Sequence, residues 1–257
     1  MSTDVAVRVS GLAKSFVRET RGRASVVPVL GDVTFEIARA EFVSIVGPSG
    51  CGKTSLLRSV AGLLDVDAGT IEVDGKAVTG PGRERAVVFQ DFALLPWASS
   101  LDNVAFGLKL QGVGRAERRR RARAALEMVG LDGFADALPH ELSGGMRQRV
   151  GIARALSVDP DVLLMDEPFG SLDEITRRSM QEELLRIWER DKKTVLFITH
   201  SVEEALFLSD RVLVMGGKPG RVVETLTPEL PRPRTRSQES SEAFTSMRDK
   251  IWETLAC

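Results

Sequence analysis

The chain has 257 residues, of which 35 are Lys or Arg and 36 are Asp or Glu, so its formal net charge is -1. This length suffices for one large α/β domain or two small ones, and a nearly neutral chain lacks the basic field of a protein that binds nucleic acid non-specifically. The two cysteines, Cys51 and Cys257, belong to no CxxC or Cys/His cluster, which argues against a disulfide framework or a cysteine metal site and indicates a reducing compartment.

The N-terminal part of the chain has the pattern of antiparallel strands. Residues 5–16, 33–37 and 70–78 alternate apolar with polar side chains, as strands with one buried face do. Asp74 and Gly75 form a turn signal inside the third segment. We therefore expect an antiparallel sheet that covers one side of the molecule.

Further along the chain, short β-branched runs are apolar on both faces and alternate with helical patterns. Strands buried on both faces are typical of a largely parallel sheet covered by helices. We expect such strands at residues 43–46, 86–89, 162–165, 194–199 and 211–215.

Strand patterns are absent between residues 100 and 156, where helical patterns dominate. We expect one domain over residues 1–226, with a helical subdomain inserted at about 91–156. Residues 227–257 begin with a Pro- and Arg-rich stretch that favours extended backbone and end in a short amphipathic pattern at 242–255. We interpret them as a tail that is too short for a second domain.

The stretch "VSIVGPSGCGKTSLL" runs from an expected strand through a glycine-rich loop into a helical pattern, the context that a phosphate loop requires. Glycines let the backbone N–H groups turn inward toward two phosphates at a helix N-terminus. Lys53 is expected to reach the β- and γ-phosphates of ATP, and the Thr54 hydroxyl to bind Mg²⁺. The expected loop residues are Gly47, Pro48, Ser49, Gly50, Cys51, Gly52, Lys53, Thr54 and Ser55.

Two carboxylates end the expected strand at 162–165 in the stretch "DVLLMDEP". Acidic side chains at the end of a buried strand are costly unless a cation is near, so Asp166 is expected to orient Mg²⁺. Glu167 points to the other side of the strand and is expected to act as general base on the attacking water. The alternative is that Asp166, Glu167 and Pro168 only cap a helix.

Several motifs together resemble the nucleotide-binding subunits of ABC transporters. "GPSGCGKT" is similar to Walker A, "LLMDEP" to Walker B, and "LSGGMRQR" to the ABC signature. The resemblance covers nearly the whole chain. It implies an α/β fold: a P-loop NTPase (RecA-like) core with an N-terminal antiparallel β subdomain and an inserted α-helical subdomain.

In that family two copies pack head to tail, and each signature closes on the ATP held by the other copy. The resemblance therefore places Ser143, Gly144 and Gly145 over the ATP of a partner subunit. Small side chains permit close backbone approach, and the following helix N-terminus faces the γ-phosphate. In this arrangement ATP joins the two subunits and its hydrolysis releases them.

The resemblance also assigns single residues. Gln90 matches the Q-loop, which senses Mg²⁺ and the lytic water; Asp173 matches the D-loop, which helps to position the opposite site; His200 matches the switch histidine that bonds the γ-phosphate.

The chain departs from the family at two positions. It has no tyrosine to stack on adenine, so Phe16 is expected to do so, and the path of the insertion at residues 18–24 beside it stays open. The second departure is Ala40, which occupies a turn position where the family commonly has glycine.

Four stretches, including "FQDFALLPWASSLDNVAFGL" and "LSDRVLVMGGKPGRVVE", resemble the nitrate, sulfonate and taurine importer branch. That branch implies a homodimer of ATPase subunits, two transmembrane permease subunits and an extracytoplasmic substrate-binding protein. It places the chain peripherally at the cytoplasmic face of the membrane. Residues 92–97 are either a permease contact or core, since exposed apolar patches often mark partner sites. The cargo, nitrate, alkanesulfonate, taurine or a pyrimidine-like precursor, stays open.

Two other classes remain as alternatives: a soluble ABC ATPase that acts on DNA or ribosomes, and the ATPase subunit of an exporter. The first usually has a long coiled coil or two cassettes, and this sequence has one cassette and no sustained heptads. The basic run at 115–126 places arginines on several sides of one helix, which favours a solvated face over nucleic-acid binding. We expect no nucleic-acid partner.

Overall fold

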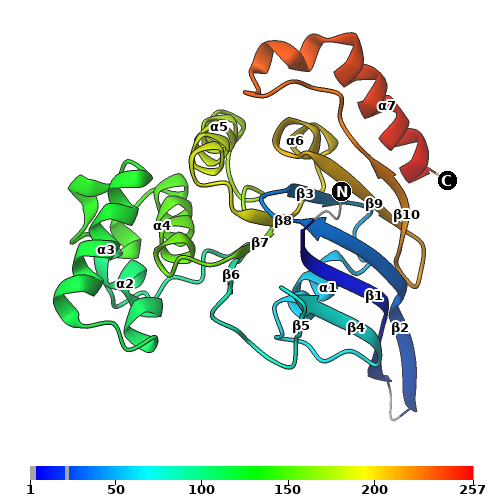
Figure 1. Ribbon diagram of the computed structural model, residues 1–257, viewed down its shortest axis with the longest axis horizontal. Coiled ribbons are helices and arrows are strands. Elements are labelled where there is room, and N and C mark those ends of the chain that lie inside the picture. The colour runs from blue at the N-terminus through cyan, green and yellow to red at the C-terminus, as the bar shows by residue number, and fades with distance from the viewer. Residues whose placement is uncertain (1–3, 21–22, 257) are drawn as a thin grey trace. The chain divides into compact units, whose positions relative to one another are not determined.

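The computed structural model describes residues 4–20 and 23–256. They form two compact units, one from Met1–Gly82 with Lys192–Cys257 and one from Arg83–Asp191. Figure 1 shows the secondary structure elements with the labels used below. Each unit is described separately, because each carries its own part of the candidate site.

The first unit contains the expected antiparallel sheet, with strand order β2-β1-β4-β5. Alternating apolar residues such as Val7 and Val9 are fully buried, while Arg8 between them is exposed. The strands are β1 (Val5–Thr20), β2 (Arg23–Ala38), β4 (Ala68–Val73) and β5 (Lys76–Ala77).

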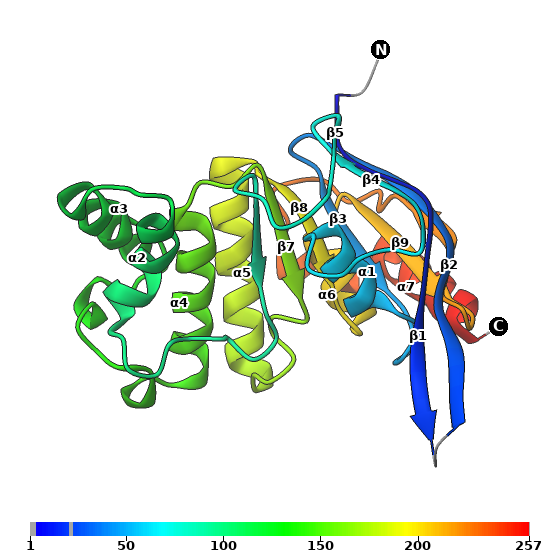
Figure 2. The same ribbon diagram turned by 90° about the horizontal axis from the view of Figure 1, so that it is seen from below.

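The insertion after Phe16 continues the first hairpin. Arg18 pairs with Ser25 and Thr20 with Arg23, so β1 and β2 extend beyond the expected strands as a long arm (Figure 2). The sequence did not predict this extension, because an exposed hairpin has no buried face to produce an alternating pattern. Residues 21 and 22 of the insertion lie outside the described residues.

The second sheet of this unit is built on β3 (Phe42–Val46), which lies parallel to both β8 (Thr194–Ile198) and β9 (Arg211–Gly216). Every residue of β3 and β8 is buried, as expected for strands that are covered on both faces. β10 (Arg221–Leu226) pairs antiparallel with β9 at the edge. The helices are α1 (Lys53–Val60), α6 (Val202–Leu208) and α7 (Glu242–Ala256), with a short 3-10 turn at Arg236–Ser240.

The tail ends in α7, close to the bounds that its amphipathic pattern predicts. Phe244 and Ile251 of α7 are buried in one apolar cluster with Val202 and Leu206 of α6. The tail helix is therefore part of the hydrophobic core of the first unit.

The second unit combines two parallel strands, β6 (Arg85–Val88) and β7 (Val162–Asp166), with a group of helices. α2 (Ser100–Leu110), α3 (Arg115–Met128) and α4 (Gly144–Ser157) pack against one another, and α5 (Glu174–Asp191) follows β7. Two 3-10 turns, Asp132–Phe134 and Pro139–Glu141, connect α3 to α4. The expected strand-free helical segment is thus present.

The basic run forms α3, which buries Ala122, Ala125 and Leu126. None of the arginines of this helix is buried. The run therefore has the solvated face that the sequence indicates. Among the described residues, no helix has the length and apolarity needed to cross a bilayer.

Candidate functional site

The phosphate loop lies in the first unit, between β3 and α1. Gly50 and Gly52 have φ values of 80° and 98°, the left-handed conformation that glycine adopts without penalty, and Gly52 is the N-cap of α1. A Cβ at Gly47 would lie 2.5 Å from the Met215 carbonyl oxygen. The glycines of the motif are therefore required by the turn and by close packing, and the loop ends at a helix N-terminus suited to anions.

Lys53 is oriented by the loop itself. Its Nζ donates to the carbonyl oxygens of Gly47 at 2.8 Å and Pro48 at 3.2 Å, and the residue is only 6% exposed. A nearly buried ammonium held at the mouth of a glycine-rich loop provides a fixed positive charge for a phosphate.

Cys51 is hidden in the same loop. Its residue is 2% exposed, and burial raises the pKa of its thiol against the opposing effect of the Lys53 charge. The thiol therefore stays protonated and shielded, so Cys51 contributes backbone rather than a reactive sulfur.

A turn that the sequence left without a role supports the phosphate loop. In the turn between β9 and β10, Gly220 pairs with the β2 backbone, donating to Val29 O at 2.8 Å and accepting from Gly31 N–H at 3.0 Å. A Cβ at Gly220 would lie 1.8 Å from the Cys51 carbonyl oxygen, so no larger residue fits there. The glycines and proline of the "GGKPG" stretch are typical of a turn, but only the structure shows that this turn contacts the phosphate loop.

Phe16 and His200 belong to the same unit. Phe16 lies on β1 opposite Val27, is 39% exposed, and has Lys14 Nζ 5.7 Å from its ring centroid. His200 is exposed and follows β8, and Ser201 next to it caps α6 by accepting the Glu204 N–H at 3.1 Å. An exposed ring and an exposed imidazole at a strand end are each accessible to a ligand.

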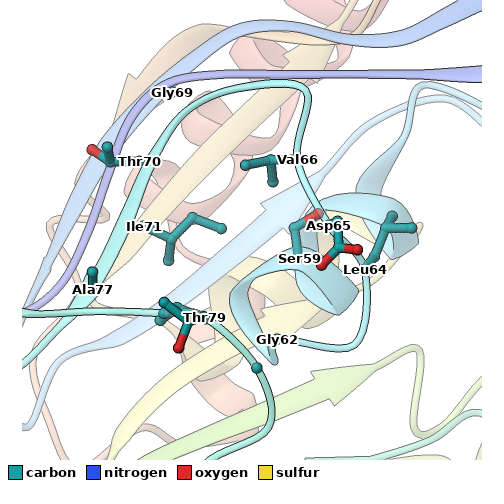
Figure 3. Close-up of a pocket in the computed structure, with 12 residues that line it drawn as sticks. Ser59, Gly62, Leu64, Asp65, Val66, Gly69, Thr70, Ile71, Ala77 and Thr79 are labelled. Atoms are coloured by element: carbon teal, nitrogen blue, oxygen red, sulfur yellow. The ribbon is translucent and has the colours of Figure 1, made fainter.

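A hollow in this unit contains none of the expected site residues. It measures about 260 Å³ and lies beside the C-terminal half of α1, between Ser59, Asp65, Ile71 and Thr79 (Figure 3). The phosphate loop is at the opposite end of α1, so this hollow is not the nucleotide site.

The second unit brings Gln90 and Glu167 together. A Cβ at Gly170 would lie 3.8 Å from Gln90 Nε2 and 3.9 Å from Glu167 Cβ, so both residues flank one glycine. Asp166 ends β7 and is 5% exposed, whereas Glu167 is half-buried in a left-handed conformation with φ of 44°. A buried carboxylate at a strand end, with a second carboxylate and an amide beside it, is suited to a cation and a water molecule.

The signature residues open α4 in the same unit. Ser143 is its N-cap and accepts the Met146 N–H at 3.3 Å, and Ser143 is exposed. A Cβ at Gly145 would lie 2.7 Å from Thr176 Cγ2 of α5, which explains the small residue there. The exposed serine and the helix N-terminus together can be presented to another molecule.

Asp173 lies beside the signature, at the N-terminus of α5. Its carboxylate accepts the Thr176 N–H at 3.0 Å, and this bond lowers the pKa of Asp173. Asp173 is exposed, so the D-loop carboxylate is ionised and accessible while it caps the helix. Among the described residues, no group of three or more His, Cys, Asp or Glu forms a ready metal cluster.

Comparison with known proteins agrees with these features. The family described as ABC transporter matches residues 30–170. A taurine import ATP-binding protein of Rhizobium johnstonii is 54% identical over 88% of this chain and 88% of its own length. An uncharacterized ABC transporter ATP-binding protein of Methanocaldococcus jannaschii is 49% identical over 98% of this chain and 91% of its own length.

Solved structures give the same result. A dimeric ATP-binding cassette in a post-hydrolysis state, bound to ADP and Pi, has a TM-score of 0.74 and 32% identity, and covers 86% of this chain and 98% of its own. The α/β fold with a P-loop core, an antiparallel β subdomain and a helical insertion is confirmed. The chain belongs to the ABC transporter family, as an ATP-binding subunit that hydrolyses ATP.

Proposed function

We propose that this chain powers an importer for taurine or a related small sulfonate. Relatives named as taurine import ATP-binding proteins come from several bacteria, and that of Pseudomonas aeruginosa UCBPP-PA14 is 46% identical over 95% of this chain. The proposed complex holds two copies of the chain and two permease subunits at the cytoplasmic face of the membrane. An external binding protein supplies the cargo.

Within this proposal the two units divide the work on ATP. Phe16 stacks on the adenine, Lys53 binds the phosphates and His200 bonds the γ-phosphate. Glu167 takes a proton from the attacking water, next to Gln90.

We propose Mg²⁺ as the metal cofactor. Its ligands would be the Thr54 hydroxyl, the Gln90 amide oxygen and the Asp166 carboxylate, a set of hard oxygen donors that leaves room for water and phosphate oxygens. The near-complete burial of Asp166 at the end of β7 fits a cation partner. When bound, the ion would neutralise charge that develops on the phosphate oxygens.

We also propose that the signature acts in trans. Ser143, Gly144 and Gly145 would close over the ATP of a second copy, and Asp173 would approach the same site. Two observations support this: the signature serine is exposed at a helix N-terminus, and the similar cassettes were solved as dimers.

The observation that carries the importer proposal is a groove after Gln90. It has a volume of about 380 Å³, and Trp97 at its edge is 76% exposed. None of residues 92–97 is buried, so the alternative that this run is core is not supported. A groove that carries an exposed tryptophan beside the charged side chains of Asp102, Lys109 and Arg118 suits a short amphipathic helix of the permease. Its lining residues are Leu95, Trp97, Ala98, Asp102, Ala105, Phe106, Lys109 and Arg118.

The test is reconstitution of the chain with its permease and binding protein in proteoliposomes. Trp97→Asp replaces the large exposed indole of the groove by a small charged side chain and should abolish taurine uptake and permease-stimulated hydrolysis. Trp252→Asp is the matched control, because Trp252 is an exposed tryptophan on α7, and it should retain both activities. Full uptake with Trp97→Asp would rule out the groove as the permease site, and no uptake of any sulfonate by the wild type would rule out the substrate class.

A further inference from the structure

The helix that begins with the signature holds the backbone that follows Gln90. Arg147, Gly151 and Arg154 are spaced by four and three residues, so they share one face of α4. The Arg147 guanidinium lies 5.7 Å from the Phe92 ring centroid, and a Cβ at Gly151 would lie 3.7 Å from the Phe92 carbonyl oxygen. This face therefore packs directly on the Q-loop.

The held backbone has an unfavourable conformation. Phe92 and Ala93 have φ values of 55° and 46°, so two consecutive residues with side chains are left-handed. Each such residue is disfavoured by the clash of its Cβ with the following carbonyl, and a consecutive pair persists only when its surroundings fix it.

Arg154 makes the contacts that fix this pair. Its Nη1 donates to the Ala93 carbonyl at 2.6 Å and its Nη2 to the Phe92 carbonyl at 2.9 Å. One planar guanidinium thus bridges the two strained residues, a geometry that an ammonium cannot reproduce. Burial lowers the pKa of Arg154, and no carboxylate pairs with it in the described part of the chain. Its charge is therefore compensated by backbone carbonyls.

We propose that Arg154 is a positioning residue that holds the Q-loop in its left-handed conformation. By this contact α4 fixes Gln90 beside Glu167 and also presents Leu95 and Trp97 in the groove. α4 and residues 92–97 then move together when a ligand binds to either of them. We call the contact of Arg154 with the Phe92 and Ala93 carbonyls the clasp. The effect on hydrolysis rests on the role proposed above for Gln90, whereas the clasp rests only on the contacts of Arg154.

The test combines loss of the clasp with relief of the strain. Arg154→Met removes both donors and should loosen residues 91–97, whose amides should exchange with deuterium about tenfold faster while the rest of the second unit stays protected. The kcat for ATP should fall about tenfold with little change in KM, because the phosphate loop is untouched. Arg154→Lys, which has one compact donor group, should give exchange rates and a kcat between those of the wild type and of Arg154→Met. It replaces Arg154→Met in the test if that variant does not fold.

Ala93→Gly is the decisive partner substitution. Glycine adopts φ of 46° without penalty, so in the Arg154→Met background Ala93→Gly should restore most of the protection and of kcat. A purely structural role of Arg154 would lower the melting temperature but would not allow this rescue. Arg123→Met on α3 removes an exposed arginine and should leave the exchange rates, kcat and the melting temperature unchanged.

The outcomes separate the two proposals. Unchanged exchange and kcat in a folded Arg154→Met variant would overturn the clasp, and so would losses that Ala93→Gly does not reverse. Faster exchange that Ala93→Gly reverses, without any loss of kcat, would support the clasp and contradict the role assigned to Gln90. Gln90→Ala measured in parallel gives the kcat expected when that role is absent.

Discussion

Ala40 lies in the turn between β2 and β3 with a φ of 57°, the left-handed conformation that favours glycine. Hydrogen bonds fix the turn: Ala40 N–H donates to Thr194 Oγ1 at 3.1 Å, and Glu41 N–H donates to the Ala38 carbonyl at 3.2 Å. The sequence identified this position as one where the family commonly has glycine. The structure adds the physical reason, which is the clash of the alanine Cβ with its own backbone.

Replacing this alanine by glycine should therefore stabilise the protein. Ala40→Gly removes the left-handed penalty, which exceeds the extra entropy of glycine in the unfolded chain, and should raise the free energy of unfolding by about 0.5–1 kcal/mol. Urea denaturation followed by circular dichroism measures this change. Ala124→Gly, on the exposed face of α3, is the control and should destabilise by about 1 kcal/mol. A loss of stability with Ala40→Gly would contradict the strain.

Site residues were predicted from the sequence wherever a motif fixes both residue type and spacing. The phosphate loop and the residues Glu167 and Ser143 are such cases, and the structure places each at the end of a strand or the start of a helix. Arg154 and Gly220 could not be predicted, because their contacts join segments far apart in the chain and no local pattern records them. The joint roles of all these residues in catalysis stay predictions.

The C-terminal tail shows where composition is least informative about structure. The Pro- and Arg-rich stretch predicted only an extended appendage, yet its arginines cap the C-terminal end of α6. Arg234, 7% exposed, donates to the carbonyls of Leu206 and, at 2.9 Å, Ser209. Arg232 donates to Leu208 O at 2.7 Å. Cations at a helix C-terminus satisfy its last carbonyls and its dipole.

Loss of this cap should destabilise the first unit. Arg234→Met keeps the length of the side chain but leaves two buried carbonyls without these donors, and should lower the free energy of unfolding by about 2 kcal/mol. Arg248→Met is the control: its exposed ion pair with Asp249 should contribute less than about 0.5 kcal/mol. Equal effects of the two substitutions, measured by thermal unfolding, would show that the Arg234 cap does not stabilise α6.

Strands and helices were predicted best where burial imposes a pattern. β3, β7 and β8 are mostly apolar on both faces and close to their expected bounds, because a strand that is covered on both faces favours apolar side chains. The β1–β2 arm was missed because its exposed residues are free of that constraint. Exposed elements are therefore the ones that sequence patterns describe least.

In the proposed dimer, each ATPase centre is divided between two copies of the chain. Each copy provides a phosphate loop in one unit and a signature in the other. In a two-fold symmetric dimer, whatever one copy gives to its partner it also receives. Because of this reciprocity, a mixture of two defective variants shows whether the signature acts on the ATP of the partner.

The most direct test mixes two variants that are each inactive. Lys53→Ala disables the phosphate loop and Ser143→Arg blocks the signature, so neither should hydrolyse ATP alone. If the signature acts in trans, the mixed dimer has one site with both defects and one intact site, and an equal mixture should recover about a quarter of the wild-type rate. If each signature serves its own chain, every site keeps a defect. A mixture no more active than either variant alone would contradict the account.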